Sequence, residues 1–401
     1  MPLSPIQPPS DVSVESPRTL RLPFDPLLTL AVIGLGICSV VTLKGATAKL
    51  IPSDPHYYVV RQAAYLAVGF VLMVIASRID YAKLRHFKAL IYGVLLFSIL
   101  AVLGLGHAAK GSTRAINFPL FSFQASELGK VLLILALSAF LVDRARQLGS
   151  RDTTVRLMIA ALVPAMLVIA QPDLGSGLVY MTIAYMLLFI AGTSWRQLAA
   201  LAVLVCLAAT FVLVAAPAAG IHLLKPYQTE RLTAFLHPSN GPSKEGAAEP
   251  SYQQQESKIA IGSGQKTGRG SHSSQVPLNF VPESDTDFVF AAVGERYGFV
   301  GAGLVLLLYG LLISRALRVL VMAKDLFGSL IAAGVAAMLM FQVFVNVGMT
   351  IGIMPITGVT LPLMSYGGSS VITTLLAVGL LQSIYVQARA SAALKGRVPR
   401  Y

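Results

Sequence analysis

The sequence is poor in charge and in cysteine. Only 12% of its 401 residues are charged, 55% are hydrophobic, and the mean hydropathy is +0.71. This composition excludes an ordinary soluble domain. Cys38 and Cys206 both fall in apolar runs, so we interpret them as packing residues and expect no disulfide framework. The histidines show no metal-ligand spacing, so the sequence predicts no histidine metal site.

Long apolar runs are what the chain does contain. A membrane-spanning helix needs roughly 17–25 mostly apolar residues. The sequence predicts ten spans, at about 26–43, 59–76, 88–106, 124–142, 156–171, 174–192, 197–219, 288–314, 327–350 and 369–388. The fifth and sixth are nearly continuous and are broken only at residues 171–175. The predicted fold class is therefore an all-α integral membrane protein with about ten transmembrane helices.

The distribution of lysine and arginine predicts the orientation, because basic loops stay cytoplasmic. With the N-terminus inside, the basic residues that fall on the cytoplasmic side are Arg78, Lys83, Arg85, Lys88, Arg144, Arg146, Arg151, Arg156, Arg196, Arg315, Arg318, Lys324, Arg389, Lys395, Arg397 and Arg400. The short outer loops carry only Lys44, Lys49, Lys110 and Arg114. We therefore expect both termini in the cytoplasm. The net charge of +13 follows from this asymmetry and from attraction to anionic lipids, so it predicts no nucleic-acid partner.

Three segments lie outside the predicted membrane domain or interrupt it. Residues 1–24 have the composition of a disordered cytoplasmic tail without a cleaved signal peptide, and residues 389–401 form a basic cytoplasmic tail. Within the membrane domain, 25–388, one large outer loop spans 220–287 and includes a predicted interfacial helix at Tyr252–Ile261. The glycine-rich stretch 262–270 lacks the G-x-G-x-x-G spacing and a preceding strand, so it predicts a flexible turn rather than a nucleotide site.

An acidic cluster marks the boundary between the large loop and the eighth span. Glu283, Asp285 and Asp287 fall within five residues, directly before an apolar run. Carboxylates at such a boundary are costly to place. Asp287 is suited to act as a general base, or to hold a divalent cation such as Mg²⁺ or Mn²⁺ against a pyrophosphate. Composition alone favours equally that Asp285 or Asp287 caps the eighth helix.

Ionisable residues inside the spans need partners or a cavity. Glu127 and Lys130 are three residues apart and share a helix face, so a local ion pair is the first interpretation. Arg61 has no local partner, which makes Glu127 a candidate for a distant one. The adjacent Glu295 and Arg296 point to different faces, so each needs its own partner or solvent.

Cations of the outer loops are candidates for binding a phosphorylated substrate. Lys110, Arg114 and Arg231 are of the residue types that bind phosphate. A solvated surface is the alternative for each of them taken alone.

Two clusters of proline and glycine flank predicted spans, at residues 171–175 and 354–370. Irregular backbone at membrane depth is tolerated only where protein or a water-filled cavity covers it. Both clusters predict re-entrant turns on the outer face. We expect them to shape the walls of the site that Asp287 faces.

These motifs together resemble the SEDS family (shape, elongation, division and sporulation), from the first span to the last. The most specific match is Pro355-Ile356-Thr357-Gly358-Val359-Thr360-Leu361-Pro362, which continues into Ser365-Tyr366-Gly367-Gly368-Ser369-Ser370. Further matches are Pro226-Tyr227-Gln228 with Arg231, Ile259-Ala260-Ile261-Gly262-Ser263-Gly264, and Pro282-Glu283 with Thr286-Asp287-Phe288.

The resemblance implies a peptidoglycan glycosyltransferase that polymerises lipid II at the outer face of the bacterial cytoplasmic membrane. It implies that Asp287 is the essential acid, and that Gln124-Ala125-Ser126-Glu127 stands for the family's Gln-Pro-Ser-Glu segment. The residues expected to bind substrate are Arg231, Lys110, Arg114, Glu127, Lys130, Ser365, Tyr366 and Gly367. The expected partners are a class B penicillin-binding protein and other membrane proteins of the elongation complex.

The chain departs from the family pattern at several positions. Ala125 replaces a proline, Ala115 a tryptophan and Glu256 a glutamine, while Ser284-Asp285 makes the acidic motif more acidic. The stretch Ser77-Arg78-Ile79-Asp80-Tyr81 favours the elongation branch, that of RodA, over the division branch, that of FtsW.

Two other functions stay open at this stage. Polar residues in spans and broken helices suit a lipid flippase, although no pair of matching interrupted spans is present in the two halves. The third hypothesis is a non-enzymatic scaffold that activates a partner synthase.

Overall fold

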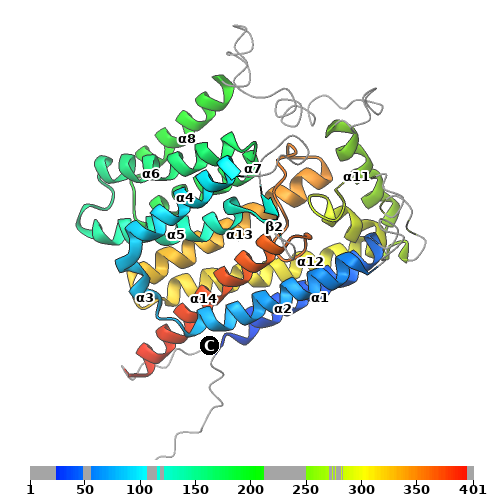
Figure 1. The fold of residues 1–401 in the computed structure, drawn as a ribbon, viewed down its shortest axis with the longest axis horizontal. Coiled ribbons are helices and arrows are strands. Elements are labelled where there is room, and N and C mark those ends of the chain that lie inside the picture. The colour runs from blue at the N-terminus through cyan, green and yellow to red at the C-terminus, as the bar shows by residue number, and fades with distance from the viewer. Residues whose placement is uncertain are drawn as a thin grey trace, which may run out of the picture.

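The computed structural model describes residues 24–47, 56–105, 115–117, 122–211, 250–270, 273, 276, 281 and 283–394. These residues form a helical bundle (Figure 1). Its helices are α1 (Pro26–Ala46), α2 (Tyr57–Arg78), α3 (Tyr81–Leu84), α4 (Lys88–Leu105), α5 (Ala125–Asp143), α6 (Arg151–Ala170), α7 (Leu174–Ile190), α8 (Trp195–Thr210), α11 (Pro250–Gly264), α12 (Val289–Met322), α13 (Leu326–Ile351) and α14 (Gly368–Leu394). Short 3₁₀ turns lie at Arg85–Phe87 and Ala145–Gln147, and strands β1 (Ile116–Asn117) and β2 (Ser122–Phe123) form an antiparallel pair.

The predicted all-α membrane fold is confirmed. In the described part of the chain, eight helical segments are long and apolar enough to cross a membrane. Two shorter apolar helices, Leu174–Ile190 and Trp195–Ala208, lie where the sixth and seventh spans were expected. The count of ten spans stays a prediction. Residues 1–23 and most of the predicted loop 220–287 lie outside the described residues.

One span differs from its prediction. The eighth was expected at 288–314, but α12 extends to Met322 and its helical geometry is broken at Gly298, with φ 63° and ψ −160°. A Cβ at Gly298 would lie 2.4 Å from the backbone nitrogen of Gly268. Only glycine combines this backbone conformation with so close an approach of a second chain segment.

Side-chain caps fix where several helices begin. Asp25 accepts hydrogen bonds from the N–H groups of Leu27 and Leu28 at the start of α1. Asp173 and Asp325 cap α7 and α13 in the same way. In contrast, the N-cap residue of α12 is Phe288, which supplies no side-chain cap. The hypothesis that Asp285 or Asp287 is the N-cap residue of this helix is therefore wrong.

Glycines bring neighbouring helices into close contact. A Cβ at Gly69 of α2 would lie 2.4 Å from the Leu375 side chain of α14, and one at Gly379 would lie 2.7 Å from the carbonyl oxygen of Met73. Gly334 of α13 packs in the same way against Ile134 of α5. Such small residues allow close helix packing, which drives association in lipid. Helices α5, α13 and α14 are the most buried, and α2 and α4 are largely exposed on the outside of the bundle.

The two ends of the bundle differ in chemistry. At one end, here called the basic end, Arg85 and Lys88 pair with Asp143, and Arg144 and Arg156 pair with Asp152. This end gathers the helix termini that carry the residues predicted to be cytoplasmic. The other end, here called the site end, carries α11 and the irregular connection between α13 and α14 (Figure 1).

Candidate functional site

The candidate site is built around the turn at 283–288, which precedes α12. Three consecutive backbone carbonyls of this turn, at residues 285–287, each accept a hydrogen bond from another element. Their donors are the backbone N–H of Tyr366 at 2.8 Å, the hydroxyl of Ser365 at 2.6 Å and the side-chain amide of Asn346 at 2.8 Å. Because three donors fix the main chain, the Asp287 side chain extends from a backbone that is held in place.

The connection between α13 and α14, residues 352–367, supplies two of these donors. Its own backbone groups are satisfied by side chains. Tyr309 of α12 donates to the carbonyl of Pro362, Ser39 of α1 donates to that of Met364, and Ser365 accepts from the N–H of Leu361. This is the cover that irregular backbone requires in an apolar environment. These contacts place the segment beside the Asp287 turn. That it shapes the wall of a site faced by Asp287 stays a prediction.

A second polar group lies at the start of α5. Lys130 donates to Glu127 at 2.6 Å, and the two side chains are only 2% and 5% exposed. The local pair expected from their spacing is confirmed. Among the described residues, this is the only hydrogen bond that the Glu127 carboxylate accepts. Buried charges normally need more partners than this, so the pair is suited to a polar ligand.

The expected long-range pair between Arg61 and Glu127 is not formed. The Arg61 guanidinium instead stacks on the ring of Tyr57, with 4.4 Å between its Cζ and the ring centroid. Tyr57 and Arg61 are four residues apart on α2, so their spacing allows this contact. It was missed because only a partner of opposite charge was sought.

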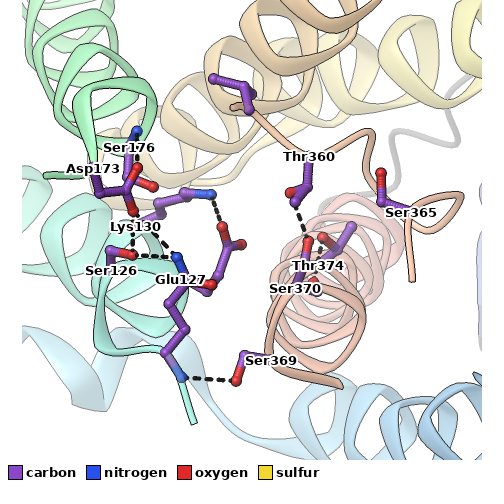
Figure 2. Close-up of polar contacts among 12 residues, drawn as sticks. Ser126, Glu127, Lys130, Asp173, Ser176, Thr360, Ser365, Ser369, Ser370 and Thr374 are labelled. Carbon is purple, nitrogen blue, oxygen red and sulfur yellow. Dashed lines mark hydrogen bonds and ion pairs between the residues drawn. The ribbon is translucent and has the colours of Figure 1, made fainter. Parts of the chain in front are cut away.

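Asp173 connects the α5 motif to the first proline–glycine cluster (Figure 2). One of its carboxylate oxygens caps α7 through the N–H of Ser176 at 3.1 Å. The other accepts from the hydroxyl of Ser126 at 2.9 Å and from the amide of Gln124 at 3.2 Å. The break at residues 171–175 therefore holds the Gln-Ala-Ser-Glu segment in position.

The two proline–glycine clusters also touch each other. A Cβ at Gly175 would lie 2.7 Å from the carbonyl oxygen of Thr357. The backbone N–H of Gln124 donates to Ser369, and the hydroxyls of Thr360 and Ser370 are 3.0 Å apart. In Figure 2, Glu127 and Lys130 lie on the side of α5 that is turned toward Thr360 and Ser370. The 355–370 segment thus contacts both the Asp287 turn and the elements around the Glu127–Lys130 pair.

Tyr366 is packed toward α2. Its ring lies 4.9 Å from that of Tyr58 and 6.2 Å from that of Tyr65, between ring centroids. Burial raises the pKa of the Tyr366 phenol, so the hydroxyl stays neutral at physiological pH. The side chain of this predicted substrate-binding residue supports the segment, and its backbone holds the turn.

The other predicted residues divide into two groups. Gly367 lies directly before α14, beside Tyr366. Lys110, Arg114 and Arg231 lie outside the described residues, so their roles stay predictions. Within the described part of the chain, no three His, Cys, Asp or Glu side chains group as a metal site. A cation held by Asp287 also stays a prediction.

Two residues of the site were missed by sequence reasoning. Asn346 is fully buried in α13 and donates both to residue 287 and to the carbonyl of Val359. Two amides, Gln342 and Asn346, interrupt a largely apolar run, and this is the signal that could have identified it. Asp173 was noted only as part of a helix break.

The adjacent residues Glu295 and Arg296 contact different groups, as expected from their positions on different faces of the helix. Glu295 is fully buried, and its carboxylate accepts the backbone N–H of Val276 at 3.0 Å. The Arg296 guanidinium lies 5.9 Å from the ring centroid of Tyr297.

Comparison with known proteins assigns the chain to a family. Residues 24–390 match the family model for FtsW, RodA and SpoVE, described as cell cycle proteins. The chain is 38% identical to the probable peptidoglycan glycosyltransferase FtsW of Thioalkalivibrio sulfidiphilus, over 93% of this chain and 91% of that protein. It is 33% identical to the peptidoglycan glycosyltransferase MrdB of Escherichia coli K12, over 91% of this chain and 94% of that protein.

A solved structure shares the fold. That structure was solved to describe the structural coordination of polymerization and crosslinking by a peptidoglycan synthase complex. The two chains superpose with a TM-score of 0.75 at 31% sequence identity, over 91% of this chain and 98% of the other.

Proposed function

Since the chain belongs to the SEDS family of FtsW, RodA and SpoVE, we propose that it is a peptidoglycan glycosyltransferase that polymerises lipid II into glycan strands. Relatives that align along more than nine tenths of the chain carry that activity in their names. The observation that carries the proposal is the anchored turn, which holds the backbone of Asp287 through three consecutive carbonyls.

In the proposed reaction Asp287 is the general base. It takes the proton of an acceptor sugar hydroxyl as that oxygen attacks the anomeric carbon of the donor. The bond from that carbon to the pyrophosphate oxygen breaks, and the polyprenyl pyrophosphate leaves with the bonding electrons. Attack from the opposite face inverts the anomeric centre in one step, so no covalent enzyme intermediate is required.

Cations then have a defined role. The departing pyrophosphate gains negative charge in the transition state, and positioned cations stabilise it. We assign this role to Lys110, Arg114 and Arg231, and we assign substrate binding to Glu127 and Lys130. The incomplete hydrogen bonding of the buried Glu127–Lys130 pair supports this assignment.

The experiment is glycan polymerisation from fluorescent lipid II by the purified protein together with a class B penicillin-binding protein. Asp287→Asn is compared with Asp285→Asn, which changes a carboxylate in the same turn. We expect a loss of roughly 10²–10⁴-fold for Asp287→Asn, the usual contribution of a general base, and little loss for Asp285→Asn. Equal activity of Asp287→Asn and wild type, at equal folded protein, would remove the proposal.

We assign the protein to the elongation branch, with a class B penicillin-binding protein as its crosslinking partner. The match to a structure from a complex that coordinates polymerization and crosslinking supports the partner. Complementation in cells tests this assignment. We expect the protein to restore rod shape in cells that lack their own RodA and not to restore division in cells that lack FtsW. The opposite pattern would assign the chain to division.

The orientation is proposed with the site end outside the cytoplasmic membrane and both termini inside. The gathering of arginine and lysine at the basic end supports it. A variant lacking Cys38 and Cys206 allows single cysteines to be introduced at Arg146 and Ser273. An impermeant maleimide added to intact spheroplasts should label position 273 and not position 146, and the reverse pattern would invert the topology.

A further inference from the structure

A groove of about 430 Å³ runs between α1 and α12 on the outside of the bundle. The two helices lie side by side (Figure 1). Ile37 and Val41 of α1 line the groove together with Val300 and Leu304 of α12, and all four side chains are exposed. In a membrane protein such a surface meets lipid chains rather than water. The groove is therefore an apolar channel open to the bilayer.

The groove is no longer than about one leaflet. Its lining extends on α12 from Val293 to Val305, across the break at Gly298, and on α1 from Ile37 to Thr42. At about 1.5 Å per helical residue, these stretches correspond to a length of at most roughly 18 Å. Half of a hydrocarbon core of about 30 Å is about 15 Å. A fatty acyl chain spans this depth, whereas a polyprenyl carrier chain is much longer.

A cation lies at the site end of the groove. Thr42 lines both the groove and a small adjoining pocket that Arg296 also lines. The guanidinium of Arg296 packs onto Gly45 of α1, where a Cβ would lie 1.7 Å from Nη1. On its other side is Tyr297, whose ring lines the groove. Arg296 therefore lies beside the point where the headgroup of a lipid would be, if its acyl chain filled the groove.

Arg296 meets no carboxylate among the described residues. Its neighbour Glu295 is fully buried and turned toward the backbone of Val276. A cation at a membrane boundary is costly unless it is paired or reaches an anionic headgroup. A lipid phosphate supplies that partner, because arginine donates two parallel hydrogen bonds to phosphate oxygens.

The loop at 265–270 adds positive charge beside Arg296 and holds the groove's edge in place. The N–H groups of Phe299 and Val300 donate to the carbonyls of Gln265 and Lys266, at 2.9 and 3.1 Å. Thr267 lines the groove. Lys266 precedes Thr267 in the sequence, Arg269 follows it, and both of these basic side chains are exposed. This loop is the glycine-rich stretch that sequence reasoning interpreted as a flexible turn.

We propose that the α1–α12 groove binds one acyl chain of an anionic phospholipid, with Arg296 holding its phosphate. The residues that line the groove are distinct from those that hold the Asp287 turn, so this lipid is separate from the glycosyl donor. The site suits a phospholipid better than a polyprenyl carrier because its apolar channel is no longer than about one leaflet and ends at a cation.

Native mass spectrometry of the full-length protein in detergent tests the proposal, with phosphatidylglycerol as the probe. Wild type should retain one tightly bound phosphatidylglycerol, and Arg296→Gln should weaken that binding by about tenfold, the value of one lost charge-assisted interaction. Val300→Trp should block the groove. Leu307→Trp is the matched control, because Leu307 is exposed on the same helix and does not line the groove.

Three outcomes would overturn the proposal. They are unchanged phosphatidylglycerol binding in both Arg296→Gln and Val300→Trp, equal binding of zwitterionic phosphatidylcholine, and displacement of the bound lipid by equimolar undecaprenyl phosphate. If Arg296→Gln does not fold, the pair Val300→Trp and Leu307→Trp decides, since it tests the same groove without removing a charge. Equal binding by these two variants would then exclude the groove as the site.

Discussion

Two buried ion pairs, at opposite ends of the bundle, differ in how completely they are satisfied. At the basic end, one oxygen of Asp25 caps α1, and the other accepts from Arg315, with 2.9 Å to its Nε. Gln382 of α14 bonds the Asp25 backbone as well. At the site end, Glu127 accepts a hydrogen bond only from Lys130 among the described residues.

The difference separates a structural role from a functional one. Asp25 joins α1, α12 and α14, and its carboxylate has no unused capacity that a ligand would fill. The Glu127–Lys130 pair is equally buried, yet its carboxylate and ammonium keep unused capacity for hydrogen bonds. A buried charge that the fold leaves incompletely satisfied is therefore the better indicator of a substrate site.

The largest effect on activity is expected at the site end. Lys130→Met removes the ammonium but keeps much of its apolar length. We expect polymerisation of fluorescent lipid II to fall by roughly 100-fold or more, because the lost charge is the one proposed to contact the substrate. Because Glu127 is left buried without its partner, the folded fraction should fall as well. The rate is therefore compared per folded molecule, with the folded fraction measured by size-exclusion chromatography. A variant with full activity would show that the pair is structural.

The converse is expected at the basic end. Arg315→Met leaves Asp25 charged and buried, which costs about 3–5 kcal/mol when one partner of a buried pair is removed. Thermal stability should fall sharply, while the activity of each folded molecule stays close to wild type. The double variant Asp25→Asn with Arg315→Met should recover part of the stability. Loss of activity per folded molecule would contradict a purely structural role.

An intermediate effect is expected where the turn is anchored. Ser365→Ala removes the hydrogen bond to the carbonyl of Thr286 and the one from the N–H of Leu361. Leaving buried groups unsatisfied costs about 1–3 kcal/mol, and the freed turn should lower polymerisation.

A matched control is Ser138→Ala in α5, whose buried hydroxyl has no hydrogen-bond partner in the described structure. It should leave activity unchanged and should not lower stability, because it removes a polar group that has no partner. Equal effects of the two serine substitutions would show that the anchor at Ser365 has no special role.

The smallest effect is expected for the exposed pairs of the basic end. Asp152→Asn breaks the contacts with Arg144 and Arg156, which lie at the surface. Exposed pairs contribute little because water and salt screen them. The melting temperature and the polymerisation rate should both match wild type. A clear drop in melting temperature would show that the surface charges of this end stabilise the fold.

The sequence predicted what local patterns determine. Apolar runs gave the spans, and a three-residue spacing gave the Glu127–Lys130 pair. The break of α12 at Gly298 was missed, because a glycine within a span does not by itself indicate a break and the segment that packs on it, at Gly268, is distant in the sequence.

Contacts between distant segments were only partly predictable. The chain's proline–glycine clusters indicated where irregular backbone lies, but the anchoring role of Asn346 depends on how α13 packs beside the turn. Arg61 was assigned a distant partner because only opposite charge was considered, whereas its guanidinium stacks on Tyr57, four residues earlier in α2.

The central claim is that Asp287 and the Glu127–Lys130 pair serve one reaction at one site. The most direct test is a double-mutant cycle on the rate of lipid II polymerisation, with Asp287→Asn, Lys130→Met and the two combined. If both residues act on the same transition state, the combined loss should be clearly smaller than the product of the single losses. A combined loss equal to that product would contradict the account, because it would mean that the two groups act independently.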